Sequence, residues 1–329
     1  NGRKGYQPRG KTLGGSSATN AMVYIRGHQT DYDRWANEEG CTGWSYKDVL
    51  PYFKLSEGNG RIRDAYHGND GPLAVNDLRS DNPFQGHYIK AAEQAGFKIT
   101  DDFNGADQEG VGIYQVTQRH GERCSVARAY VHPHMDTRQN LTVYLHSMAQ
   151  RIVFEGKKAV AVEFLKNGQL MRVEARKEII LAAGAFQSPQ LLMVSGVGDS
   201  QELAQHGIPV VHHLPGVGKN LQDHPDFIFG YTANSTDLLG VSLKGTWRLI
   251  KEFFRFKNER RGMLSSNFAE GGGFLKTDPS LSAPDVQLHF VVALVDDHAR
   301  TFHLQHGLSC HVCLLRPKRS EEHTSELQS

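Results

Sequence analysis

The sequence predicts an α/β fold, because one segment has the pattern of a buried strand that enters a helix through a glycine turn. Residues 179–183 are all apolar, as expected of a strand covered on both faces. Gly184 provides the turn, Ser188 is placed to cap the following helix, and Pro189 suits its first position. The amino end of such a helix can face a pyrophosphate, so this unit is typical of doubly wound, dinucleotide-binding sheets.

A run of strands before this unit is the second observation. Residues 141–156, 158–165 and 169–176 have the pattern of strands, and Asn167-Gly168 forms a hairpin turn between the last two.

Helices are predicted mainly near the start of the chain. The segments are 31–40, 45–58 with an interruption at Pro51, and the amphipathic 83–95, which Gly96 ends. Helices and strands therefore both contribute to the fold.

The composition excludes several classes of protein. The chain has 329 residues, of which 39% are hydrophobic, and this is enough for a large core and two domains. Lys and Arg number 37 against 36 Asp and Glu, so no charge excess favours nucleic acid as a partner. No apolar run is long enough for a transmembrane helix. Four cysteines do not make a disulfide framework, and we expect a reducing, cytoplasmic location.

The segment GYQPRGKT, residues 5–12, satisfies the phosphate-loop pattern of nucleotide hydrolases. That loop follows a buried strand and opens a helix, whereas residues 1–4 are polar and Gly14-Gly15 would break a helix at once. Pro8 also removes one N–H group from a loop whose function is to present them. We therefore do not interpret the segment as an ATP site.

The same loop has features that suit a flat ligand with polar edges and apolar faces, such as a flavin. Gly14-Gly15 permits a close approach of the backbone, Ser16, Ser17 and Asn20 add small polar groups, and residues 21–24 add an apolar wall. A glycine-rich turn before a buried segment would share these features, so both interpretations remain open at this point.

Two longer motifs decide between them. GKTLGGSSATNAMVYIRG, from Gly10, and GAFQSPQLLMVSGVG, from Gly184, resemble the two signatures of the glucose–methanol–choline (GMC) oxidoreductases. DYDRWA, DFNG, QEGVG, RCSVARAY and GVGKNLQDHP are also similar to that family, and the resemblance covers residues 1–318. Thr19 departs from it, since an aliphatic residue is more usual there.

The resemblance implies an incomplete, Rossmann-like α/β FAD-binding domain and an α+β substrate domain around an antiparallel sheet. We expect residues 1–225 to form the FAD-binding region, with an excursion into the substrate domain at about 60–138. Residues 226–318 would then be an incomplete substrate domain, and 319–329 resemble the translation of a sequencing adapter.

The family oxidises alcohols, with FAD as hydride acceptor, and the segments PDVQLHFVVALVDDH and HGLSCHVCLLRPK are similar to its choline-dehydrogenase-like and aliphatic alcohol dehydrogenase members. The resemblance therefore implies oxidation of a primary alcohol by a flavoprotein. Choline dehydrogenase proper and a flavin-containing hydroxynitrile lyase are the alternatives.

The resemblance also implies which residues line the cofactor. These are Thr12, Gly14, Gly15, Asn20, Ala21, Met22, Val23, Ala149 and Gly184. Some relatives attach FAD through a His in the first loop, and Thr19 stands at that position, so we predict non-covalent FAD.

Catalytic residues are not expected in this chain. The family His and the Asn or His that follows would lie beyond Lys318, and the first βαβ unit would precede Asn1. The chain is thus expected to be a fragment that turns over no substrate.

Two further residue groups have alternative interpretations. Glu270 occurs where choline-type enzymes place an acid toward the substrate, yet a structural role before three glycines is favoured. Cys310 and Cys313 form a CxxC, but in a strand they would point to opposite faces, so no metal site is predicted.

The segment LKGTWRLIKEFFRFKNERR combines cations with Trp and Phe. It is either a helix with a solvated basic face or a helix that lies on a membrane surface. The second interpretation would suit a dehydrogenase that passes electrons to quinone, peripherally bound at the inner membrane.

Overall fold

The computed structural model describes residues 6–295, 301 and 303–317, and these fall into two compact units. One unit contains residues 142–223, and the other contains the described residues of 2–141 and 224–316. We call them the small and the large unit. The second boundary lies close to the predicted one at 225, whereas the assignment of the first 59 residues to an FAD-binding domain stays a prediction.

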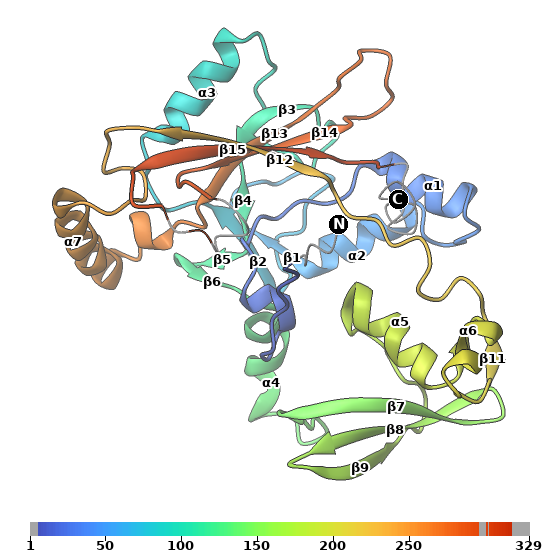
Figure 1. Ribbon diagram of the computed structural model, residues 1–329. Coiled ribbons are helices and arrows are strands. Elements are labelled where there is room, and N and C mark those ends of the chain that lie inside the picture. The colour runs from blue at the N-terminus through green and yellow to red at the C-terminus, as the bar shows by residue number, and fades with distance from the viewer. Residues whose placement is uncertain (1–5, 296–300, 302, 318–329) are drawn as a thin grey trace. The chain divides into compact units, whose positions relative to one another are not determined.

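A five-stranded antiparallel sheet forms the centre of the large unit (Figure 1). Its order is β12 (Asp226–Thr232), β15 (Gly307–Leu314), β14 (Val286–Val291), β13 (Ala269–Leu275) and β3 (Gly110–Ile113). This is the antiparallel sheet expected of the substrate domain.

Both faces of this sheet carry apolar side chains, because successive residues of a strand point to opposite sides. Phe274 packs with Phe103 and Tyr114 on one face. Phe290 packs on the other, where Tyr88 of α3 (Phe84–Gln94) stacks on its ring at 4.5 Å between centroids. The α3 helix ends before Gly96, whose φ is 83°, as predicted.

Smaller elements complete the large unit. They are α1 (Gln29–Asn37), α2 (Tyr46–Ser56), β1 (Glu57–Asn59), β2 (Leu73–Asp77), β4 (Gln115–Val116), β5 (Gln118–Arg119), β6 (Glu122–Arg123), α4 (His132–Met135) and α7 (Leu243–Glu259). Three single turns of helix are η1 (Gly15–Ala18), η2 (Ala127–Val131) and η3 (Met263–Ser265). The predicted interruption of α2 at Pro51 is wrong, since the helix runs through it. Ser45 and Asp48 form a capping box that holds its first turn.

The small unit contains an antiparallel sheet of β7 (Ser147–Glu155), β8 (Lys158–Lys166) and β9 (Gln169–Glu174). Asn167 and Gly168 have φ of 52° and 78°, which confirms the predicted hairpin turn. The remaining elements are α5 (Gly184–Val194), α6 (Ser200–Gln205) and the parallel pair β10 (Val197–Gly198) and β11 (His212–His213).

The predicted strand at 179–183 is not formed. A strand requires a neighbour for its backbone hydrogen bonds, and none of the described segments pairs with these residues. Ile180 is consequently 81% exposed. The helix after it begins at Gly184, earlier than predicted, so Pro189 lies inside α5 instead of at its first position.

Candidate functional site

The glycine-rich loop of the first signature is fixed to the body of the large unit. Ser17 Oγ donates to Gly14 O at 2.5 Å and accepts from Val126 N at 2.9 Å. A Cβ on Gly14 would lie 3.1 Å from Cβ of Ala127, and its φ is 90°. The loop therefore needs glycine here to pack against the RCSVARAY segment, a second family-like motif.

The residues that follow are held equally firmly. Asn20 Oδ1 accepts from Met22 N at 3.0 Å and from Arg123 Nη1 at 2.8 Å. Asn267 Nδ2 donates to Ala21 O at 2.8 Å. Met22 is buried with a φ of 59°, a strained conformation for a residue other than glycine. This segment is thus a rigid platform with a defined backbone path.

One side of this loop is open. A Cβ on Gly15 would meet nothing within 4 Å, and Asn20 and Ala21 are exposed. Thr12 is exposed as well, and Val23 is half-buried, with its side chain against the Phe103 cluster. A flat aromatic group with polar edges fits such a surface, because glycine lets it approach the backbone and the small polar groups can bond its rim. The residues present therefore fit a flavin.

The loop does not have the structure of a phosphate loop. Only the single turn η1 follows Thr12, where a nucleotide hydrolase has a long helix. Gly5, the first glycine of that pattern, lies outside the described residues.

Two of the predicted cofactor residues lie in the small unit. Ala149 is on β7, an edge strand of its sheet, beside a bulge between Ala149 and Arg151. Gly184 begins α5 with a φ of 88°, and a Cβ there would meet nothing within 4 Å. Ser195 Oγ accepts from Ile152 N at 2.8 Å, which ties α5 to β7. The structure thus brings the strand and the helix of these residues together.

A pocket in the small unit joins two more family-like motifs. Pro189 and Met193 of α5 line it together with Gly218 and Asn220 of the GVGKNLQDHP segment. The second signature and this segment, separated in sequence, therefore meet at one surface.

Glu270 is enclosed in the large unit, with no exposed surface. Its carboxylate accepts from Gln85 Nε2 at 2.8 Å and from Ser266 Oγ at 2.5 Å. Burial raises the pKa of this carboxyl, and the hydrogen bonds offset only part of the effect. The arrangement favours the structural role over direct contact with a substrate.

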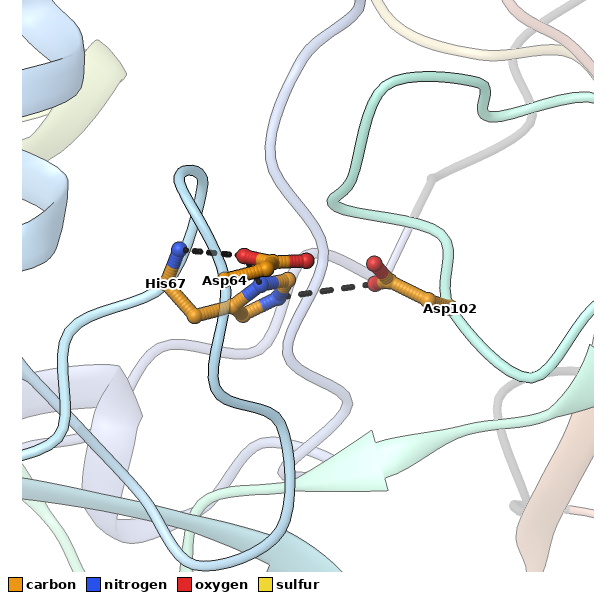
Figure 2. Close-up of side chains that lie close together, drawn as sticks. All are labelled: Asp64, His67 and Asp102. Carbon is orange, nitrogen blue, oxygen red and sulfur yellow. Dashed lines mark hydrogen bonds and ion pairs between the residues drawn. The ribbon is translucent and has the colours of Figure 1, made fainter.

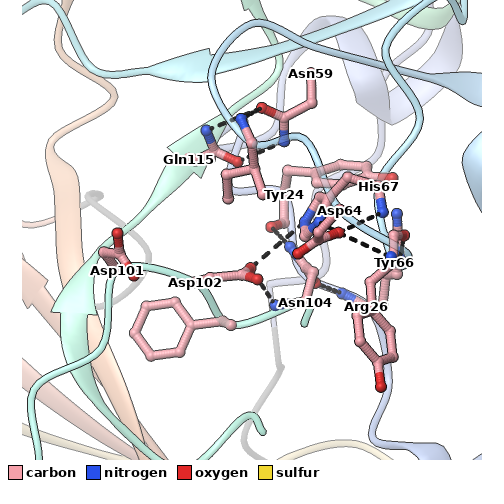
Figure 3. A network of polar contacts seen from close by, with 12 residues as sticks. Tyr24, Arg26, Asn59, Asp64, Tyr66, His67, Asp101, Asp102, Asn104 and Gln115 are labelled. Carbon is pink, nitrogen blue, oxygen red and sulfur yellow. Dashed lines mark hydrogen bonds and ion pairs between the residues drawn. The ribbon is translucent and has the colours of Figure 1, made fainter. Parts of the chain in front are cut away.

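Sequence reasoning missed a buried polar network directly after the first signature (Figure 3). The Arg26 guanidinium pairs with Glu57 and donates to Tyr66 O at 2.8 Å. The backbone N–H of Arg26 donates to Asn104 Oδ1 at 2.7 Å. Asn59 donates to Gln115 Oε1 at 2.8 Å in the same network. A buried Arg inside an otherwise apolar stretch is the one signal that could have pointed to it.

His67 lies in this network between two carboxylates, with its side chain fully buried (Figure 2). Nδ1 is 2.9 Å from Asp64 Oδ1, and Nε2 is 3.5 Å from Asp102 Oδ1. Burial alone would lower the pKa of His67, but its interactions with the carboxylates of Asp102 and Asp64 outweigh it and raise the pKa. The pKa of each carboxyl is lowered in turn, because the bonds with His67 outweigh its burial.

These three residues are close enough to hold a metal ion. Both ring nitrogens face carboxylates, however, as in a protonated imidazole, whereas a ligand nitrogen would have to lose its proton. We therefore interpret the cluster as an ion network that joins the 60–70 and 100–105 loops.

The CxxC lies on a strand, as predicted. Cys310 and Cys313 lie on β15, where residues three apart point to opposite faces. Cys313 Sγ contacts Asp226 Oδ1 at 3.2 Å.

Comparison with known proteins agrees with this geometry. The family model described as GMC oxidoreductase matches residues 1–226. The chain belongs to the GMC oxidoreductase family. It is 45% identical over 321 residues to an alcohol dehydrogenase [acceptor] of Pseudomonas putida, which covers 97% of this chain and 58% of that protein. It is 41% identical over 318 residues to the mitochondrial choline dehydrogenase of Homo sapiens, covering 96% of this chain and 52% of that one.

Two solved structures are also similar to this chain. Pyridoxine 4-oxidase from Mesorbium loti has a TM-score of 0.78 at 26% identity, over 94% of this chain and 57% of that one. A formate oxidase has a TM-score of 0.81 at 25% identity, over 95% and 60%. The chain thus spans little more than half the length of the proteins it matches. The family match and these structures confirm the predicted α/β fold class.

Among the described residues, no helix is long and apolar enough to span a bilayer.

Proposed function

We propose that this chain is part of a flavoprotein that oxidises primary alcohols. The observation that carries the proposal is the first-signature loop, which is rigidly anchored by Ser17 and Asn20 yet open at Gly15, in a chain of the GMC family. FAD, when bound, accepts a hydride and so supplies the redox chemistry.

The chain's own contribution is to hold and orient this cofactor without a covalent bond. The flavin would be lined by Thr12, Gly14, Gly15 and the segment Asn20–Val23. The adenosine and pyrophosphate part would be lined by Ala149 and Gly184. The positions of Ala149 and Gly184 support their assignment. Unpaired backbone groups of the edge strand β7 can bond a purine, and those at the amino end of α5 can bond a phosphate. We place no catalytic base among residues 1–318.

The substrate is proposed to be an uncharged primary alcohol, with choline as the second candidate. Glu270, the one acid suggested to attract a quaternary ammonium, is buried and hydrogen-bonded, and this supports the uncharged alcohol over choline. The relatives include enzymes of both names. Aldehyde formation by the full-length protein from medium-chain alcohols and from choline separates the two.

A hydroxynitrile lyase of the same family would break a C–C bond without net redox change. The alcohol should therefore bleach the flavin absorbance under anaerobic conditions if the proposal is right, and leave it unchanged for a lyase.

We further propose that electrons pass to a quinone, and that the protein acts in the cytoplasm, bound peripherally at the inner membrane. The four cysteines, all among the described residues, form no disulfide bond, which supports a reducing compartment.

Gly15→Asn tests the cofactor site. The φ of Gly15 is 55°, which Asn tolerates, and the position is open, so the fold should survive. The new side chain would occupy the space proposed for the flavin, and FAD affinity should fall by about tenfold or more, about 1.4 kcal/mol. FAD titration of the apoprotein, followed by flavin fluorescence, measures it.

Gly40→Asn is the matched control, since Gly40 also has a positive φ of 73° and open space, away from the loop. Equal FAD affinity of the two variants and the parent would contradict the proposed site.

A further inference from the structure

Helix α7 is attached to the large unit by its charged side. Arg248 Nη2 pairs with Asp237 Oδ1 at 2.5 Å, and Arg255 Nη2 pairs with Asp81 Oδ2 at 2.6 Å. Glu252, on the same side, accepts from the backbone of the following turn. Arg248 and Arg255 are thus used for internal contacts and do not contribute to a solvated face.

The opposite side of α7 carries an exposed apolar stripe. Leu243 is 87% exposed, Trp247 68%, Ile250 45% and Phe254 56%. Their spacing of four, three and four residues places them in one row along the helix. Phe253 adds to it, at 55% exposure. An aligned apolar row of this kind marks an interaction surface instead of scattered surface residues.

Lysines border this stripe. Lys244, Lys251 and Lys257 are all exposed on α7. The one exposed acid of the helix, Glu259, is its last residue and lies 3.5 Å from Arg255 Nε. The outward side therefore combines an apolar centre with positive flanks.

We propose that α7 lies in the surface of a membrane that contains anionic lipids, with the Leu243–Phe254 stripe in the acyl boundary and the lysines at the headgroups. An apolar row flanked by lysines is the pattern of helices that lie in the plane of the interface. A two-fold contact with a second copy is disfavoured, because it would place the lysines of one copy beside those of the other. The inference rests on the proposed function, in which electrons pass to a quinone dissolved in lipid. It identifies α7 as the part of the protein that contacts the membrane.

The test uses the full-length, FAD-loaded protein and sedimentation with vesicles. One set contains phosphatidylcholine alone, and the other adds phosphatidylglycerol. The parent should sediment with the second set. Brominated lipid should quench its tryptophan fluorescence, and the part due to Trp247 is found by difference from a Trp247→Ser variant. Trp247→Ser with Phe254→Ser should lower the partition coefficient at least about tenfold. Lys244→Gln, Lys251→Gln and Lys257→Gln together should lower binding to anionic vesicles by on the order of a hundredfold, with little effect at high salt.

Leu55→Ser is the matched control, because Leu55 is 72% exposed on another helix of the same unit. It should bind vesicles like the parent. The inference is overturned if the stripe variant also binds like the parent, or if the stripe variant lowers the mass of the protein in solution without lipid, which would show a dimer contact. It is also overturned if aqueous quenchers fail to reach Trp247 without lipid, since the rest of the protein then covers the stripe.

Alcohol-dependent reduction of a water-soluble acceptor, measured on each variant, separates this inference from the proposed function. If that activity persists while vesicle binding is absent, only the membrane contact fails. If vesicle binding is present without any activity, the proposed function fails and the membrane contact stands.

Discussion

His67 connects three segments that are distant in sequence order. Its ring lies between Asp64 and Asp102, and its Nε2 is 4.0 Å from Glu57 Oε1. Glu57 in turn pairs with Arg26, which follows the loop proposed to hold the flavin. Positive and negative groups alternate through this cluster, which is exposed only at Asp64, so each stabilises the charge of the next.

The contribution of His67 to stability should depend on pH. Its pKa is raised in the folded protein, so the stabilisation is complete below the unfolded value of about 6.5 and is lost as pH rises through the folded pKa. The pKa values of Asp64 and Asp102 are lowered, so their part is complete above about 3.9 and is lost in acid. The network is therefore strongest between about pH 4 and pH 6.5.

His67→Asn should lower the free energy of unfolding by about 2 kcal/mol at about pH 5.5, and by less at about pH 9. Urea unfolding of parent and variant at both values measures the difference. His87→Asn is the control, because His87 is exposed on α3. A loss that is the same at both pH values would refute the ionic description of the cluster.

The sequence could not predict this network for a physical reason. Asp64, His67 and Asp102 are ordinary polar residues in loops, and only the folded backbone brings residues 64 and 102 within reach of one ring. Motif spacing reports contacts within one segment, whereas this cluster depends on loops that meet in space. The positive φ of Gly14, by contrast, is a property of the local backbone, and a pair of glycines signals it in the sequence.

At the scale of elements, the hairpin between β8 and β9 shows what local sequence can determine. Asn167 and Gly168 occupy both central positions of the turn with positive φ, and few other residue pairs allow this. The prediction succeeded because the turn depends on these two residues alone.

Gly168→Ala should therefore destabilise the protein by about 1 kcal/mol, because alanine is strained at a φ of 78°. Gly86→Ala should act in the opposite direction and stabilise by about 0.5–1 kcal/mol, since Gly86 is inside α3 with open space around it. Thermal unfolding of the two variants measures both effects. Equal shifts of the same sign would contradict the conformational argument.

Elements that depend on distant partners were predicted less well. Residues 179–183 have a strand pattern, but their hydrogen bonds require a neighbour that the described residues do not supply. In α7 the helix was predicted, but not the direction of its faces, because the ion pairs of Arg248 and Arg255 are made with residues far away in sequence.

At the scale of the whole molecule, the chain is divided into two compact units. It leaves the large unit for the small one at about residue 141 and returns at about residue 223. Each unit has its own buried side chains, such as Phe164 and Leu203 in the small unit and Phe103 and Phe290 in the large one. Segments between compact units have few buried contacts, and such segments open at low free-energy cost.

Brief trypsin treatment should therefore cut first at the unit boundaries. Arg138 is exposed in an irregular segment before the first boundary, and Lys219 lies in a turn before the second. The sheet of β12 to β15 should resist, because each of its strands is hydrogen-bonded to a neighbour. Mass spectrometry of the first fragments identifies the sites, and Arg138→Gln should remove the first cut while a matched Arg172→Gln on β9 should not. Early cuts inside β12–β15 would contradict the division into two units, since the most stable part of the large unit would then be opening before the segments that join the units.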